Sequence, residues 1–143
     1  VTHMSQGYYA SWNTSPIRTW LHNDFKPLLP DELTNAIVDV QKTYFDVEQN
    51  VGTSIDTLWI PSVREMFGGT LYETSGATYT SYFTNNASRI KKTEFQFAEY
   101  WWLRTSSKIT QPYGQHFQSI DKNGKQAGGL FTNTNAIIFG FCM

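Results

Sequence analysis

Apolar residues recur at helical spacing near the start of this chain and at alternating spacing further on. Over residues 15–28 they lie three or four positions apart, which places on one face of a helix the side chains Ile17, Trp20, Leu21, Phe25 and Leu28. Ser15 suits the N-cap of this helix, and Pro16 suits its first position. Pro27 and Pro30 are expected to end it.

A second short helix is expected to begin at Asp31, because Asp31 and Glu32 place negative charge in a first helical turn. From Ile37 onward, apolar residues alternate with polar ones, as in a half-buried strand. Residues 49–54 are mostly polar and predict a loop. Residues 57–60 are a short, largely apolar run closed by a proline, which predicts a buried strand.

Ser62 and Glu65 have the spacing of a capping box, so a third short helix is expected to begin there. Gly68 and Gly69 are expected to end it. Residues 70–95 are rich in threonine, serine, asparagine and tyrosine. They predict irregular loops with room for one helical turn.

The segments 116–120 and 125–131 predict a β-hairpin, because Asn123 and Gly124 between them supply the positive φ angles of a tight turn. Residues 136–143 are largely apolar and predict a last strand that is buried on both faces. Cys142 lies in this run, so we expect a buried and inert thiol. As the only cysteine, it leaves no disulfide within the chain and no cysteine-based zinc cluster.

Trp101 and Trp102 are adjacent in an apolar stretch, and adjacent side chains on a strand point to opposite faces of the sheet. We therefore expect this strand to lie where the layers of the domain meet. The large aromatic residues expected to be buried close together are Trp20, Trp59, Trp101, Trp102 and Phe141. Arg104 follows in the same strand and should pair with backbone carbonyls or a carboxylate, because an unpaired buried charge is costly.

The chain has 143 residues, which suits a single domain with a real core. Its net charge of −1 and the absence of a basic run argue against nucleic acid as a partner. No apolar run approaches the roughly 20 residues of a membrane span, so no direct membrane insertion is expected. Residues 1–11 have no clear periodicity and are interpreted as a linker, a tag or a truncated N-terminal strand.

Several stretches carry a resemblance when they are taken in order. Residues 15–25, 58–65, 100–106 and 117–124 are similar to the patterns IRTWLNNDF, LFLLSVEEV, YWWLRSP and FVNSDG. Residues 139–143 stand where the pattern GVRPAFCI is expected, but the Arg-Pro of that pattern is missing. These motifs resemble a domain family of unassigned function, found in bacterial (mostly Firmicute) surface proteins and in phage proteins.

The family pattern is similar in turn to the C-type-lectin-like fold. The resemblance covers roughly residues 12–143 and implies an α+β domain with small antiparallel sheets, two or three short flanking helices and long loops at one end. We expect residues 1–143 to form this single domain. Proteins with this fold include sugar-binding lectins, phage and bacterial receptor-binding domains, and formylglycine-generating enzymes. Fold-level likeness alone does not choose among these functions.

Catalysis and metal binding lack the residue patterns they need. The three histidines are scattered, and the formylglycine-generating enzymes rely on more than one cysteine. The Glu-Pro-Asn and Trp-Asn-Asp triplets of Ca²⁺-dependent lectins do not occur. We therefore expect a non-enzymatic protein with no catalytic residues, no metal ion and no other cofactor.

The best candidates for a binding surface are the polar loops before and after the tryptophan pair, and Asn133 and Asn135 before the last strand are placed to join the same face. They mix hydrogen-bonding groups with amphipathic rings, as adaptable binding surfaces and sugar sites do. The alternative for each residue is an ordinary solvated loop. The candidate ligand-binding residues are Ser106, Ser107, Lys108, Gln111, Tyr113, Gln115, His116, Asn133 and Asn135.

These observations predict a ligand-binding module of a phage tail fibre or of a bacterial surface adhesin, located outside the cell, on a virion or on a cell surface. Its partner would be a glycan or a protein on a host or other cell. The second hypothesis is a structural or oligomerisation module within a fibre, for example a homotrimer. A lectin-fold enzyme is the third.

Overall fold

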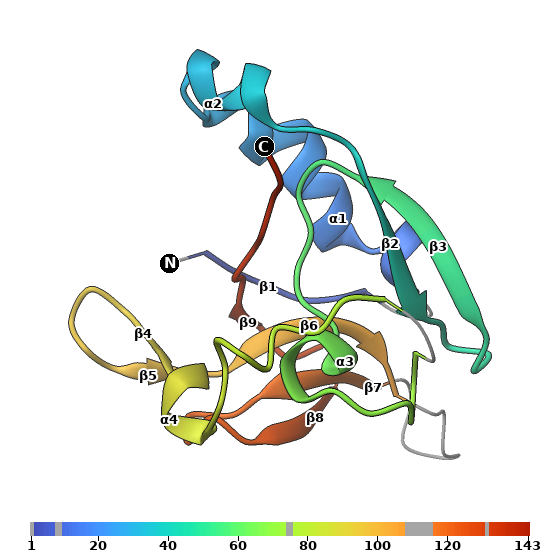
Figure 1. The fold of residues 1–143 in the computed structure, drawn as a ribbon. Helices are drawn as coiled ribbons and strands as arrows, with labels where there is room; N and C mark the ends of the chain where they lie inside the picture. The colour runs from blue at the N-terminus through green and yellow to red at the C-terminus, as the bar shows by residue number, and fades with distance from the viewer. Residues whose placement is uncertain (1, 8–9, 74–75, 108–115, 131) are drawn as a thin grey trace.

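The computed structural model describes residues 2–7, 10–73, 76–107, 116–130 and 132–143. Within these residues the chain forms a five-stranded sheet, two two-stranded sheets and several short helices (Figure 1). The architecture is therefore mixed α+β, as the sequence predicted.

The five-stranded sheet has the order β1-β9-β6-β7-β8, with β6 at its centre. Neighbouring strands are antiparallel except β6 and β9, which are parallel. All six residues of β6 are buried, which fits a strand covered on both faces. The strands are β1 (His3–Met4), β6 (Trp101–Ser106), β7 (His116–Ile120), β8 (Gln126–Leu130) and β9 (Asn135–Ala136).

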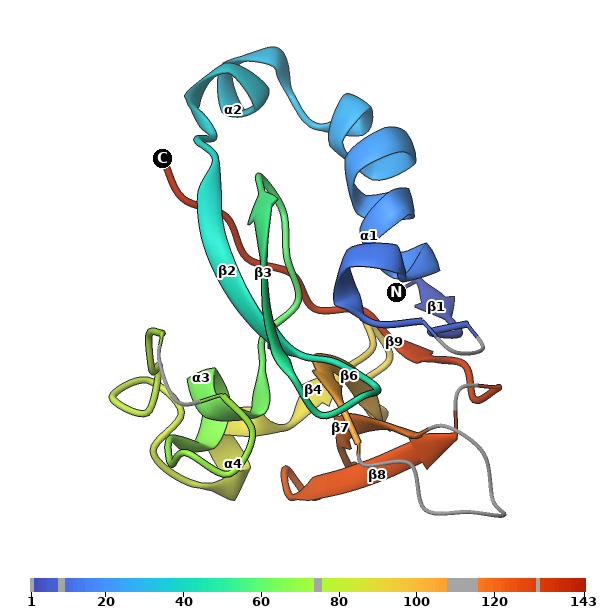
Figure 2. The ribbon, with the colours of Figure 1, turned by 90° about the vertical axis from the view of Figure 1, so that its right-hand side faces the viewer.

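The smaller sheets are hairpins: β2 (Val40–Phe45) with β3 (Val51–Asp56), and β4 (Lys91–Lys92) with β5 (Ala98–Glu99). Figure 2 shows β2 and β3 as a long ribbon in front of the C-terminal segment. The prediction of a loop over residues 49–54 was wrong, because β3 begins at Val51. The composition of β3 gives no strand signal. It forms a strand because it pairs with β2, and this pairing places the Tyr44 ring against Gly52.

The helices are short and begin where the sequence predicted. Ser15 caps α1 by accepting a hydrogen bond from the Arg18 amide, and Ser62 and Glu65 form the capping box of α3. After α1 the chain continues through a π turn (Leu21–Phe25) and a 3-10 turn (Lys26–Leu28). The helices themselves are α1 (Pro16–Trp20), α2 (Asp31–Ala36), α3 (Val63–Phe67) and α4 (Asn86–Arg89).

Trp101 and Trp102 point to opposite faces of the sheet and enter two different cores. Trp102 packs with Phe117 and the α1 side of the molecule, whereas Trp101 packs with Met66 of α3 and with Leu103. The expectation of one shared aromatic cluster was therefore wrong, because period-2 alternation separates the two rings. Of the other expected members, Trp59 is buried, while the side chains of Trp20 and Phe141 are only half-buried.

The C-terminal segment differs from the strand buried on both faces that was predicted for residues 136–143. Only its beginning belongs to β9, and beyond this it makes isolated bridges through Gly140 and Cys142. Cys142 is exposed, so the prediction of a buried thiol was wrong. The segment leaves the sheet and runs along the edge of the molecule, where its apolar residues are half covered.

The N-terminal segment takes part in the fold. His3 and Met4 pair with β9, and the buried side-chain amide of Gln6 donates a hydrogen bond to the carbonyl of Leu103 in β6. Residues 3–6 therefore contribute to the main sheet and its core.

Replacing either central tryptophan should be costly. We expect Trp101→Ala and Trp102→Ala each to lower the free energy of unfolding by about 3–5 kcal/mol, because each leaves a large cavity in its own core. Urea denaturation of the single variants measures this. Unchanged stability in both variants would contradict the two-core arrangement.

Candidate functional site

The residues predicted to bind ligand differ in burial, although strand pairing places Ser106 opposite Phe117 and His116 opposite Leu130, at one end of the sheet. Ser106 is fully buried as the last residue of β6, and Asn135 is buried in β9. Ser107 is half-buried and Asn133 is exposed, while the backbone of His116 begins β7. The remaining candidates lie outside the described residues: Lys108, Gln111, Tyr113 and Gln115.

A line of polar side chains leads from Ser107 across the sheet. The Gln118 amide donates a hydrogen bond of 2.5 Å to the Ser107 hydroxyl. The Gln126 amide donates one of 2.8 Å to the Gln118 side-chain oxygen. Gln126 is exposed and reaches the rim of a pocket, so this line connects the start of the predicted binding loop with that pocket.

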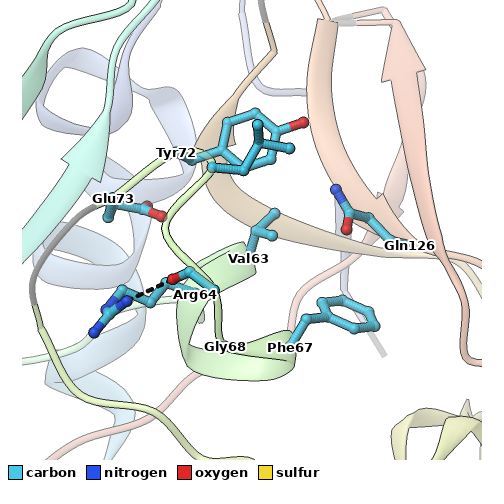
Figure 3. Close-up of a pocket in the computed structure, with 9 residues that line it drawn as sticks. Val63, Arg64, Phe67, Gly68, Tyr72, Glu73 and Gln126 are labelled. Atoms are coloured by element: carbon cyan, nitrogen blue, oxygen red, sulfur yellow. Dashed lines mark hydrogen bonds between the residues drawn. The ribbon is translucent and has the colours of Figure 1, made fainter.

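The pocket lies between α3, the segment that follows it, and β8. Its volume is about 100 Å³. Figure 3 shows Val63 at its centre, with the carboxyl group of Glu73 on one side and the side chains of Phe67 and Gln126 on the other. The lining residues are Val63, Arg64, Phe67, Gly68, Gly69, Leu71, Tyr72, Glu73 and Gln126.

The sequence after α3 folds back over the helix for local reasons. Gly68 and Gly69 adopt φ angles of 71° and 76°, a conformation that other residues rarely take. The Arg64 guanidinium then donates hydrogen bonds to the carbonyls of Gly69 and Gly76 (Figure 3 shows the first). Arg64 therefore holds the returning segment that forms one wall of the pocket.

Glu73 carries a fully buried carboxyl group at this wall. The Thr105 hydroxyl donates to its Oε1 at 3.0 Å and accepts from the Val63 amide at 2.9 Å. The other carboxyl oxygen of Glu73, Oε2, has no hydrogen-bond partner among the described residues. Burial raises the pKa of Glu73, and the charge of Arg104 only partly offsets this, so folding favours the protonated carboxyl group.

A second buried carboxylate, Glu65, behaves in the opposite way. It lies 2.6 Å from Arg104 Nη1 and 2.5 Å from Lys42 Nζ, and it accepts the Ser62 amide at 3.0 Å. Burial would raise the pKa of Glu65, but the two cations outweigh burial and lower it. The stability that Glu65 contributes is therefore present at neutral pH and is lost as the pH falls through its folded-state pKa.

The pocket combines groups suited to binding. It offers aromatic rings, an exposed amide, a guanidinium and an apolar floor. The described residues contain no group of three histidine, cysteine, aspartate or glutamate side chains that could hold a metal ion. Sequence analysis missed this pocket. The signal in the sequence was the capping box followed by Gly68 and Gly69. This pattern indicates a short helix after which the chain can reverse direction and fold back over the helix.

The chain belongs to DUF6273, a domain family of unknown function whose model matches residues 2–138. A family of unassigned function is what the sequence motifs indicated. Comparison with curated proteins and with solved structures found no match. In the described part of the chain, no helix has the length and apolar character needed to cross a membrane.

We expect Glu73→Gln to stabilise the protein increasingly as the pH rises. A raised folded-state pKa means that stability is present below the unfolded pKa and is lost as the pH rises through the folded pKa. A neutral amide avoids this loss. Urea denaturation between about pH 4 and pH 8 measures it, with the exposed Glu94→Gln as control. A stability difference from wild type that does not change with pH would contradict the raised pKa.

Proposed function

We propose that this domain is a non-enzymatic ligand-binding module of a phage fibre or of a bacterial surface adhesin. Its ligand is a glycan or a protein on a host or cell surface. The C-type-lectin-like resemblance of the sequence motifs supports this class of function, and the pocket beside α3 supports its chemistry.

The observation that carries the proposal is the set of groups around Val63. The rings of Phe67 and Tyr72 offer apolar faces, while Gln126 and Arg64 offer hydrogen-bond donors at the rim. Sugars present the same combination, an apolar face beside hydroxyl groups, and protein ligands present it through single side chains.

The volume of the pocket limits how much of a ligand it can hold. Its 100 Å³ is well below the roughly 300–1,000 Å³ that encloses a whole small molecule. It therefore takes one substituent of a larger ligand, such as a sugar ring substituent or one side chain. The remaining contacts come from the surface around the pocket.

A structural or oligomerisation module is the second candidate, and one observation favours it. The β4–β5 hairpin projects from the body of the domain (Figure 1), and Phe95 and Phe97 on it are 73% and 68% exposed. Exposed rings of this kind suit a contact between copies of the chain.

The test is a glycan array combined with binding to intact bacterial cells. Wild type should bind as a monomer, and Gln126→Ala should lower affinity at least about tenfold while changing stability by less than about 0.5 kcal/mol, as expected for an exposed residue. Tyr113→Ala and His116→Ala test the predicted loop in the same way. Lys122→Ala, in the exposed β7–β8 turn, is the matched control.

Light scattering distinguishes the two candidates. A trimer that binds neither glycans nor cells, and that Phe95→Ser and Phe97→Ser dissociate, would overturn the binding module in favour of the oligomerisation module.

A further inference from the structure

One oxygen of the buried Glu73 carboxyl group has no partner among the described residues, although Glu73 lines the pocket beside α3. The Thr105 hydroxyl donates its single hydrogen to the other oxygen, Oε1, and its own oxygen accepts from the Val63 amide. Thr105 therefore has no hydrogen left for Oε2. An unpaired buried acceptor is destabilising, and a ligand that brings a donor to Oε2 removes that penalty.

The opposite side of the pocket has a hydrogen-bond donor to spare. Figure 3 shows Gln126 across Val63 from Glu73, with the Tyr72 hydroxyl near its amide group. The Gln126 amide and the Tyr72 hydroxyl together carry three donor hydrogens. One of these bonds to Gln118 and one forms the bond between the two side chains, which leaves one for a ligand.

The charges around the pocket favour a neutral ligand group. The Arg64 guanidinium lies on the pocket wall, and the guanidinium carbon of Arg89 lies 4.3 Å from the centre of the Phe67 ring. These cations repel a ligand ammonium group, whereas a ligand carboxylate meets the carboxyl group of Glu73. A neutral group that has both a donor and an acceptor avoids both conflicts.

An acetamido group has this composition and a matching shape. It is planar, and its N–H and C=O groups point in opposite directions, as in a trans peptide bond. Those directions match Glu73 on one side of the pocket and Gln126 on the other (Figure 3). A water molecule takes about 30 Å³ in the liquid, so a pocket of about 100 Å³ holds about as many non-hydrogen atoms as an acetamido group has.

We propose that the pocket beside α3 binds the acetamido group of an N-acetylated amino sugar, an inference that rests on the binding function proposed above. The ligand N–H donates to Oε2 of Glu73, and the ligand carbonyl accepts the spare hydrogen of the pair formed by Gln126 and Tyr72. The methyl group packs on the apolar floor formed by Val63 and Phe67.

The mouth of the pocket favours a sugar over an acetylated lysine side chain, which ends in the same chemical group. Leu71 lines the pocket and is 82% exposed, so it offers an apolar surface beside the opening. The apolar face of a pyranose ring covers this surface while the sugar hydroxyl groups stay in water. The narrow alkyl stem of an acetylated lysine leaves most of it uncovered.

The first test compares sugars that differ only at carbon 2. The 2-acetamido sugars of the glucose, galactose and mannose series are each paired with the plain hexose and with the deacetylated amino sugar. At least one acetamido sugar should bind at about pH 8, where the carboxyl group of Glu73 is more ionised than at lower pH. Its two partners should bind at least about tenfold more weakly, because neither supplies both the N–H and the carbonyl group. Isothermal titration calorimetry measures this.

The second test replaces the acceptor with a donor. In Glu73→Gln, Thr105 keeps an oxygen at the Oε1 position, so the new NH₂ group takes the Oε2 position and opposes the ligand N–H. Binding of the acetamido sugar should fall at least about tenfold, while urea denaturation shows a fold at least as stable as wild type. Glu94→Gln, exposed in the β4–β5 turn, should bind like wild type.

Three results would overturn this inference and leave the binding module standing. In the first, the domain binds glycans or cells, but acetamido sugars bind no better than plain hexoses. In the second, Glu73→Gln binds the acetamido sugar as tightly as wild type does. In the third, an acetylated-lysine peptide binds and no acetamido sugar does. A domain that binds neither glycans nor cells would instead contradict the proposed function itself, and this inference with it.

Discussion

The buried guanidinium of Arg104 is the interaction on which the rest of this domain depends. Its Nε donates to the Thr43 carbonyl of β2 at 2.8 Å, and its Nη1 donates to the Ile60 carbonyl at 2.8 Å and to Glu65 of α3 at 2.6 Å. A buried charge without partners is costly, so β2, the segment before α3 and α3 itself must all meet at β6. A bulge in β6 assists, since the Arg104 amide bonds to Pro61 in place of the neighbouring strand.

The candidate site follows from the next residue of the same strand. Arg104 fixes the start of α3 through Glu65, and Thr105 reaches the Val63 amide and Glu73. Consecutive residues of β6 thereby position both walls of the pocket. Burial acts to raise the pKa of both carboxyl groups. Two contacting cations lower the pKa of Glu65, whereas Glu73 accepts a hydrogen bond from a hydroxyl group and its pKa stays raised.

Local chemistry made part of this structure predictable. The caps at Ser15 and Ser62 and the turn at Gly124 depend only on residues close in the sequence. Partners for Arg104 were predictable because its strand is buried. Strand β3 was missed because it becomes a strand only through its pairing with β2. The pocket was missed for a related reason. Its walls come from the aperiodic residues after Gly68, and tertiary contacts alone bring Gln126 to them.

The proposed binding function depends on the surface beside α3. The polar rim of the pocket beside α3 is where we propose that a substituent of a glycan or a protein side chain binds. This pocket lies on segments whose course is fixed by contacts with the core around Trp101. A rigid support of this kind lets binding residues vary without loss of the fold.

A double-mutant cycle between Arg104 and Glu65 tests the central claim most directly. Urea denaturation would measure Arg104→Met, Glu65→Gln and the double variant. Each single change should cost about 3–5 kcal/mol, because it leaves a buried charge without its partner. The double variant should cost less than the sum of the two, with a coupling of about 1–3 kcal/mol. Arg104→Met combined with the exposed Glu94→Gln should be additive. Additivity between Arg104 and Glu65 would contradict the account, because the four segments would then meet for some other reason.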